Sequence, residues 1–380
     1  MPAAVDALER AVQHGNIAGA RMILQQLVAS RTLQQSDIAA LTKLIDEAEA
    51  TNPIAEINKC RALDALAFVT GKGGKVISQK GEGGEEEMAL MMADFDHDQS
   101  EADGRGRGIA ALKEVKEGEI LLEVPAAAHM SIKSAESTPG IDKVFKAESA
   151  ANGGVLRSFN GLALYLLHQT HKVDSVFREY ICSLPLHVPV PFLWSDADLP
   201  QEFLADDKVV EDRRVARELV ELSYNVTVPA MLEKYPDVFQ ADELTTAKWS
   251  WACSVILSRA LPLKKSGLMG SWSLEDTLMY DPAILLEVFK KPPQSEGAVL
   301  TLVPVVDMIN HESSEKLKCG LDVKSDGTVV VTTGPSGLSR GYEVAVSYSD
   351  KLCGTAPLSR WGFVLPPCPG EEGDTGGESS

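Results

Sequence analysis

Three short stretches of this sequence carry residues that could bind a small ligand and act on it chemically. Residues 104–108 (Gly-Arg-Gly-Arg-Gly) place three glycines before a predicted strand, and glycine allows positive φ angles and close approach of the backbone to a ligand. Pro304–His311 ends an apolar strand with Asp, Asn and His side chains, and Glu343–Tyr348 is an alternating strand that ends in tyrosine. Each alone has an ordinary alternative: a hairpin entry, a turn and a packed core aromatic residue.

Residue spacing excludes several common sites. The glycine stretch is not the G-x-G-x-x-G dinucleotide fingerprint, because no helix follows it and its third glycine is misplaced. No C-x-x-C pair and no Cys/His cluster at zinc-ligand spacing occurs among the six cysteines, which are Cys60, Cys182, Cys253, Cys319, Cys353 and Cys368. We therefore expect no metal site and no disulfide framework, and Cys368 is expected to stand alone.

Hydrophobic periodicity predicts the elements that must position these stretches. Strands are predicted at 109–112 and 120–125, joined by a Glu117-Gly118 turn, and again at 300–306, 328–332 and 342–348. A helical segment begins with Phe159–His171 and continues, with interruptions, to about Ala260. The pattern predicts an α+β fold in which strands from both ends of the domain pair across about 170 residues of mainly helical chain.

Composition divides the rest of the chain. Residues 1–70 show helical periodicity and are expected to form a helical N-terminal region. Residues 71–103 are rich in glycine and acids and are expected to form a flexible linker, and the acidic residues 366–380 a disordered tail. These two acidic stretches hold much of the formal net charge of −19. Such a chain has no electrostatic footprint for nucleic acid, although the acidic stretches could attract a basic protein.

The order and spacing of the motifs carry more information than any one of them. The sequence resembles the SET-domain protein methyltransferases, in particular the branch of the Rubisco large-subunit lysine methyltransferase, over roughly Gly104 to Pro367. The matching residues are Gly106-Arg107-Gly108-Ile109, Gly118-Glu119, Trp251-Ala252 with Ser258-Arg259, Asp307-Met308-Ile309-Asn310-His311, Tyr348 and Gly362-Phe363-Val364, with the helical stretches 162–167 and 180–185.

This resemblance implies a fold and a site. The expected fold is α+β, with short sheets and a threaded C-terminal segment in a SET domain over 104–365, interrupted by a helical insert at about 135–297. The cofactor would be S-adenosylmethionine, bound by the backbone of Arg105, Gly106 and Arg107 and by Arg259, Asp307, Asn310 and His311. Tyr348 would be the active-site tyrosine. The alternatives are a strand-tying role for His311, a surface salt bridge for Arg259 and core packing for Tyr348.

Three positions depart from the pattern of the branch after Tyr348. Gly354 stands where an asparagine is usual, and Trp361 replaces a tyrosine. Pro357 falls inside an expected helix, which must then begin late or be lost, because proline is tolerated only in the first turn. These departures keep a catalytically inactive interaction module open as an alternative function.

We therefore predict a protein-lysine N-methyltransferase with a protein substrate, more readily a non-histone one. A histidine acceptor is a second alternative, because neutral imidazole needs less deprotonation. No apolar run is long enough to span a membrane, since the longest, residues 298–306, is far below about 20 residues. Asp6 and Glu9 make the N-terminus unlike a secretory or transit peptide, so cytosol or nucleus is expected, with the chloroplast as the alternative by analogy with the branch.

Overall fold

The structure is a computed structural model. It describes residues 24, 37–44, 65–80, 85–94, 107–151, 156, 158–185, 188, 190–194, 201–265, 272–274, 283, 286, 298–315, 317–349 and 352–368. Most of the predicted N-terminal region, part of the predicted helical insert and most of the acidic tail lie outside these residues. Within them, no helix is long and apolar enough to cross a membrane.

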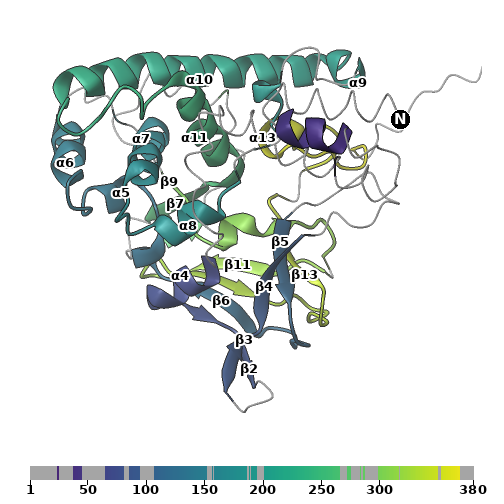
Figure 1. Ribbon diagram of the computed structural model, residues 1–380. Helices are drawn as coiled ribbons and strands as arrows, with labels where there is room; N and C mark the ends of the chain where they lie inside the picture. The colour runs from purple at the N-terminus through teal and green to yellow at the C-terminus, as the bar shows by residue number, and fades with distance from the viewer. Residues whose placement is uncertain are drawn as a thin grey trace, which may run out of the picture.

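Two small four-stranded sheets form the lower part of the molecule in Figure 1. The first has the order β1 (Lys75–Val76), β6 (Ile120–Val124), β12 (Val329–Thr332) and β11 (Gly320–Val323), all antiparallel. Val331 pairs with Leu122 and both side chains are buried, so the apolar residues of these strands specify the register. The predicted pairing of strands from both ends of the domain is confirmed.

The second sheet carries the motif strands. Its order is β10 (Asn310–His311), β13 (Glu343–Val346), β5 (Arg107–Ala111) and β4 (Leu90–Asp94), with β10 parallel to β13. The smaller sheets consist of β2 (Ser78–Lys80) with β3 (Glu86–Met88), and of β7 (Leu261–Lys265) between β8 (Trp272–Leu274) and β9 (Val299–Thr301). Strands β5 and β6 follow each other along the chain but lie in different sheets, because the chain turns at Gly118 with φ +72°.

The prediction of a flexible linker at 71–103 is wrong, because β1 to β4 lie in this stretch. Ala89 and Leu90 are buried, while the neighbouring Glu86 and Glu87 are exposed. The many acids therefore mask short strands: β1 pairs with the distant β6, β2 pairs with β3, and β4 pairs with β5, the next strand along the chain. The strand predicted at 300–306 is also shorter than expected and ends at Thr301.

A helical layer lies at the end of the molecule opposite the sheets (Figure 1). It consists of η2 (Ala126–Ala128), α5 (Ile132–Ala135), α6 (Asp142–Ala150), α7 (Ser158–His171), α8 (Arg178–Ser183), η3 (Pro191–Leu193), α9 (Gln201–Leu204), α10 (Asp207–Lys234) and α11 (Thr246–Arg259). Helix α7 confirms the predicted helix, and it packs against α11 beneath the long α10. The insert is not helical throughout, because β7 and β8 also fall within it.

The end of the N-terminal region belongs to the same core. Helix α4 (Ala65–Gly71) buries Leu66 and Phe68, and the Phe68 ring lies 5.9 Å from that of Phe177 and 6.3 Å from that of Tyr180, measured between ring centroids. A second helical segment is described at 37–44. The helical prediction for residues 1–70 is confirmed for these two pieces, and the rest lies outside the described residues.

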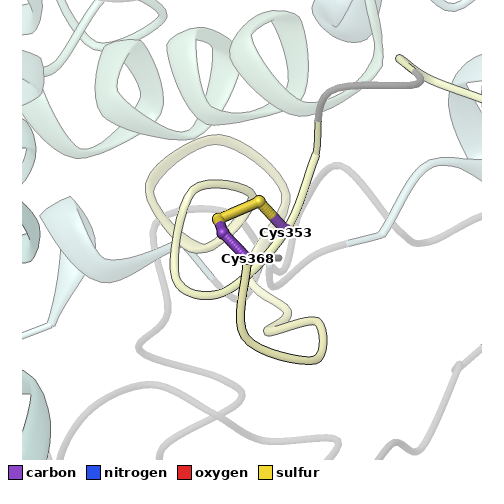
Figure 2. The surroundings of a disulfide bond; sticks show 2 residues. All are labelled: Cys353 and Cys368. Atoms are coloured by element: carbon purple, nitrogen blue, oxygen red, sulfur yellow. A yellow bond between two sulfur atoms is a disulfide. The ribbon is translucent and has the colours of Figure 1, made fainter. Parts of the chain in front are cut away.

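The C-terminal segment folds back on itself as a closed loop. Helix α13 (Leu358–Trp361) follows Pro357, so the helix begins late, as predicted. Gly354 donates to Pro366 O at 2.8 Å and accepts from the amide of Leu365 at 2.9 Å. Figure 2 shows the disulfide between Cys353 and Cys368, which closes the loop.

The expectations that disulfides are absent and that Cys368 stands alone are therefore wrong. Fifteen residues separate Cys353 from Cys368 in sequence, and the turn at Gly354, with φ +55°, lets the two ends of the loop meet. Cys182 is also disulfide-bonded. Among the described residues, Cys253 and Cys319 are free and buried.

Candidate active site

The chain makes a strained turn before it reaches the Asn310-His311 pair. Val305 has φ +72°, which is unfavourable for a β-branched residue, and it is fully buried. The following 3-10 turn η5 (Val306–Met308) is held by three backbone bonds. The amides of Asp307 and Met308 donate to Val303 O and Val305 O, both at 3.0 Å, and that of Ile309 donates to Val306 O at 3.2 Å. Strand pairing between β10 and β13 then fixes Asn310 beside Ala345.

Arg259, the last residue of α11, reaches this turn from the helical layer. Its Nη1 donates to the backbone carbonyl of Asp307 at 2.8 Å. Its Nε is buried and has no hydrogen-bond partner among the described residues. Arg259 thus binds a backbone carbonyl of the motif, which argues against the surface salt bridge that was its alternative.

The Asp307 side chain is nearly buried and points to a second helix of the insert. Its Oδ2 accepts a hydrogen bond of 2.5 Å from the phenol of Tyr180 on α8. Tyr180 is fully buried, and both this burial and the charge of Asp307 raise the pKa of Tyr180 well above its usual value. The phenol therefore stays protonated and donates.

Asn310 and His311 make different contacts on the sheet. The Asn310 amide donates to Glu343 Oε1 at 2.6 Å, at the start of β13. His311 Nδ1 accepts from the backbone amide of Tyr348 at 3.0 Å, so His311 ties β10 to the end of β13. The strand-tying role that was the alternative for His311 is thus present in the structure.

Tyr348 lies at the centre of an aromatic group. Its hydroxyl donates to Ile309 O at 2.7 Å. Its ring centroid lies 5.3 Å from that of His311, 5.1 Å from that of Trp361 and 6.3 Å from that of Phe363. We call Tyr348, His311, Trp361 and Phe363 the aromatic cluster.

The environment keeps the Tyr348 phenol in its neutral form. Burial raises the pKa of Tyr348 far above its usual value, and the charges of Glu343 and Asp307 act in the same direction. Arg259 and Arg360 oppose this rise. Tyr348 can therefore donate or accept a hydrogen bond at neutral pH, but it cannot serve as a phenolate base.

Arg360 anchors the C-terminal loop to the helical layer. It is buried, its Nε donates to Leu257 O at 2.9 Å, and its guanidinium lies 4.6 Å from the ring centroid of Trp361. Sequence analysis missed Arg360, Glu343 and Tyr180 as site residues. Glu343 and Tyr180 lie in two stretches that the sequence analysis named, 343–348 and 180–185. No short motif marks Arg360.

The predicted glycine-rich stretch is described only in part. Arg105 and Gly106 lie outside the described residues, and for Arg107 the structure gives the backbone, which pairs with Asp94 at the start of β5. Because β5 pairs with β13, the stretch enters the sheet that leads to Tyr348. The structure thus brings Arg259, Asp307, Asn310, His311 and Tyr348 together, whereas Arg105 and Gly106 lie outside the described residues.

A pocket lies apart from this site, and the described residues form no metal-binding cluster. This pocket, of about 390 Å³ and lined in part by Thr138, Phe177 and Thr301, contains none of the predicted site residues. Across the ranges that the structure describes, no group of three or more His, Cys, Asp or Glu side chains could hold a metal ion.

Comparisons with known proteins give distant similarities. No family model matches the chain. It is 25% identical over 271 residues to the chloroplastic Rubisco large-subunit N-methyltransferase of Pisum sativum, covering 69% of this chain and 46% of that protein. It is 22% identical over 182 residues to the chloroplastic [fructose-bisphosphate aldolase]-lysine N-methyltransferase of Arabidopsis thaliana, covering 48% and 35%. The chain therefore spans less than half the length of these relatives.

Solved structures give the fold. Rubisco LSMT bound to AdoMet superposes with a TM-score of 0.51 at 16% identity, covering 80% of this chain and 56% of that one. The SET domain of LSMT bound to lysine and AdoHcy gives a TM-score of 0.50 at 18% identity, covering 79% and 56%. These similarities confirm the α+β fold and the resemblance predicted from the motifs. The chain has the SET-domain fold, and the relatives it is similar to are named as N-methyltransferases of the Rubisco large subunit and of fructose-bisphosphate aldolase.

Proposed function

We propose that this protein transfers a methyl group from S-adenosylmethionine to a lysine side chain of a protein substrate. The observation that carries the proposal is the neutral Tyr348 phenol, which lies 2.7 Å from Ile309 O. It lies beside the turn of Asp307, which Arg259 contacts from α11 and which leads to Asn310 on β10. A protonated tyrosine beside a backbone carbonyl can orient an amine without taking its proton. Similarity to lysine methyltransferases of the same fold supports this assignment.

The residues present suit the proposed cofactor. The buried Nε of Arg259 lacks a hydrogen-bond partner among the described residues, although a buried guanidinium N–H normally has one. A guanidinium matches the geometry of a carboxylate such as that of the methionine part of S-adenosylmethionine. Arg259, Asn310 and His311 would hold the cofactor, together with the backbone of 105–107. When bound, the cofactor supplies a sulfonium methyl group that a neutral amine can attack.

Deprotonation of the acceptor lysine follows from its surroundings. A free lysine has a pKa of about 10.4 and is charged at neutral pH, whereas attack on the methyl carbon needs the lone pair of a neutral amine. Trp361 and Phe363 offer an apolar wall beside Tyr348, whereas the nearby charges are of both signs, Arg259 and Arg360 against Glu343 and Asp307. Desolvation at this wall disfavours an ammonium group, so its proton leaves to solvent before the C–N bond forms and the S–C bond breaks. Tyr348 then orients the amine.

The relatives indicate the class of substrate and a location. They are named for Rubisco and for fructose-bisphosphate aldolase, and both are named chloroplastic. We propose a lysine of a non-histone protein as the acceptor, and the similarity favours the chloroplast over the cytosol or nucleus. A histidine acceptor would use the same aromatic cluster. Imaging of a fluorescent fusion would test the location.

The test begins with the cofactor. Calorimetric titration with S-adenosylmethionine and with its demethylated product should show saturable binding to the wild type and weaker binding to Asn310→Ala. Labelled methyl transfer to fractionated protein extracts should then fall at least about tenfold in Tyr348→Phe. Tyr342→Phe, which alters an exposed tyrosine on the same segment, is the matched control.

Two outcomes would contradict the proposal. Absence of binding at millimolar cofactor would exclude the methyltransferase function and favour the inactive interaction module. Equal transfer by wild type and Tyr348→Phe would exclude the role of Tyr348. Mass spectrometry of the labelled product distinguishes a lysine from a histidine acceptor.

A further inference from the structure

The turn that carries the candidate cofactor residues cannot hold its shape through local interactions alone. Val305 adopts φ +72° and ψ −47°, a conformation of the kind that costs roughly 1–3 kcal/mol and persists only when its surroundings impose it. The bonds within the turn are three short-range backbone bonds, donated by the amides of Asp307, Met308 and Ile309. Contacts from elsewhere in the chain must therefore keep the turn in place.

Tyr180 supplies such a contact from the helical insert. Its side chain is fully buried on α8, 127 residues before Asp307 in sequence, and its phenol donates to Asp307 Oδ2 at 2.5 Å. A hydrogen bond to a carboxylate is about twice as strong as one between neutral groups. Loss of this donor from a nearly buried carboxylate would be costly, and it would loosen the turn that carries Asp307.

Movement of Asp307 would change the positions of the residues that contact this turn. The backbone carbonyl of Asp307 accepts a hydrogen bond from Arg259 Nη1 at 2.8 Å. Two residues later, the carbonyl of Ile309 accepts a hydrogen bond from the Tyr348 hydroxyl. The side chain and the backbone of Asp307 are therefore held from α8 and α11, two different helices of the insert. This arrangement makes the insert a part of the site rather than a separate cover.

We propose that Tyr180 is a positioning residue, which fixes the strained Val305–Met308 turn so that Arg259 and Asn310 can hold the cofactor. Tyr180 does not touch the reacting groups and acts through Asp307. The expected effect of Tyr180 on cofactor binding rests on the proposed function. Its structural part, control of the turn by Tyr180, is independent of any ligand.

The experiment compares two tyrosines that differ in what their hydroxyls contact. Tyr180→Phe removes the bond to Asp307. Tyr165→Phe is the matched control, because Tyr165 is also fully buried in the insert and its hydroxyl makes a 2.5 Å hydrogen bond, but to Thr138. Hydrogen exchange of the apo protein should be about tenfold faster at the amides of Asp307 and Met308 in Tyr180→Phe and unchanged in Tyr165→Phe.

The cofactor readout separates this inference from the proposed function. The dissociation constant for S-adenosylmethionine should rise about tenfold in Tyr180→Phe only. Faster exchange of the turn in Tyr180→Phe, with no cofactor binding even by the wild type, would reject the methyltransferase function and keep the positioning role. Unchanged exchange in Tyr180→Phe, or the same increase in both variants, would overturn the positioning role.

A second pair of variants tests the same bond from the other side. Asp307→Asn keeps an oxygen that can accept from Tyr180, whereas Asp307→Ala removes it. Exchange at the amide of Met308 should be accelerated about tenfold more in Asp307→Ala than in Asp307→Asn. Equal exchange rates in these two variants would refute the role of Tyr180, even if Tyr180→Phe failed to fold.

Discussion

Removal of the Cys353–Cys368 disulfide should release the C-terminal loop without unfolding the domain. The disulfide closes a loop with a sequence separation of 15 residues, and the chain-entropy relation assigns about 3 kcal/mol to a loop of that length. Because the loop lies at the end of the described chain, this free energy should act on local opening of 353–368. About 3 kcal/mol corresponds to an increase of about 150-fold in the population of the open loop.

Hydrogen exchange can measure this local opening directly. In Cys353→Ser the amides of Gly354 and Leu365, which bond across the loop, should exchange about 100-fold faster than in the wild type. Amides of β12 should not change, and Cys319→Ser, which alters a free buried cysteine, is the control for loss of a sulfur atom. Methyl transfer should also fall, because Trp361 and Phe363 lie in this loop. Unchanged protection of Gly354 and Leu365 would show that Arg360 and the backbone bonds hold the loop without the disulfide, and would refute the reasoning.

Other predictions concern buried groups. Arg360→Ala should lower the free energy of unfolding by about 2–4 kcal/mol, measured by urea denaturation, because it leaves Leu257 O without its donor and removes the contact with Trp361; a loss below about 0.5 kcal/mol would contradict this. Burial lowers the pKa of His129 from 6.5 to about 4, so folding gains stability above pH 6.5 and loses it as pH falls toward 4. The difference of about 2.5 pH units corresponds to about 3 kcal/mol, and the stability of His129→Gln should fall less over this interval than that of the wild type. Burial raises the pKa of Cys253, so its thiol should resist alkylation until the protein unfolds; rapid modification of the native protein would count against it.

Elements with strong local patterns could be predicted from the sequence. Helix α7 and strands β6, β12 and β13 have apolar periodicities that tertiary contacts do not override. Tyr348 and His311 were predicted because their motifs fall in a recognisable order. Pro357 also has a local effect, since its ring fixes where α13 begins.

Features that depend on distant partners could not be predicted. The strands within 71–103 lie in a stretch rich in acids and are short, and β1, with two residues, forms a strand through its pairing with the distant β6. Tyr180 and Asp307 lie 127 residues apart, and a single sequence contains no signal that the two residues are in contact. Cys353 and Cys368 are 15 residues apart and form no C-x-x-C pair, so their pairing depends on the path of the loop between them.

The C-terminal end of α11 explains why these separate contacts converge on one site. The last carbonyls of a helix lack partners within the helix and carry partial negative charge, so they attract cations. Arg360 donates there to Leu257 O at 2.9 Å and to Ala260 O at 3.4 Å, and thereby fixes α13 and the aromatic cluster. Arg259, in the same last turn, donates to Asp307 O at 2.8 Å. One helix end thus sets the distance between the turn that would hold the cofactor and the aromatic cluster that would receive the acceptor lysine, so a shift of α11 would change both at once.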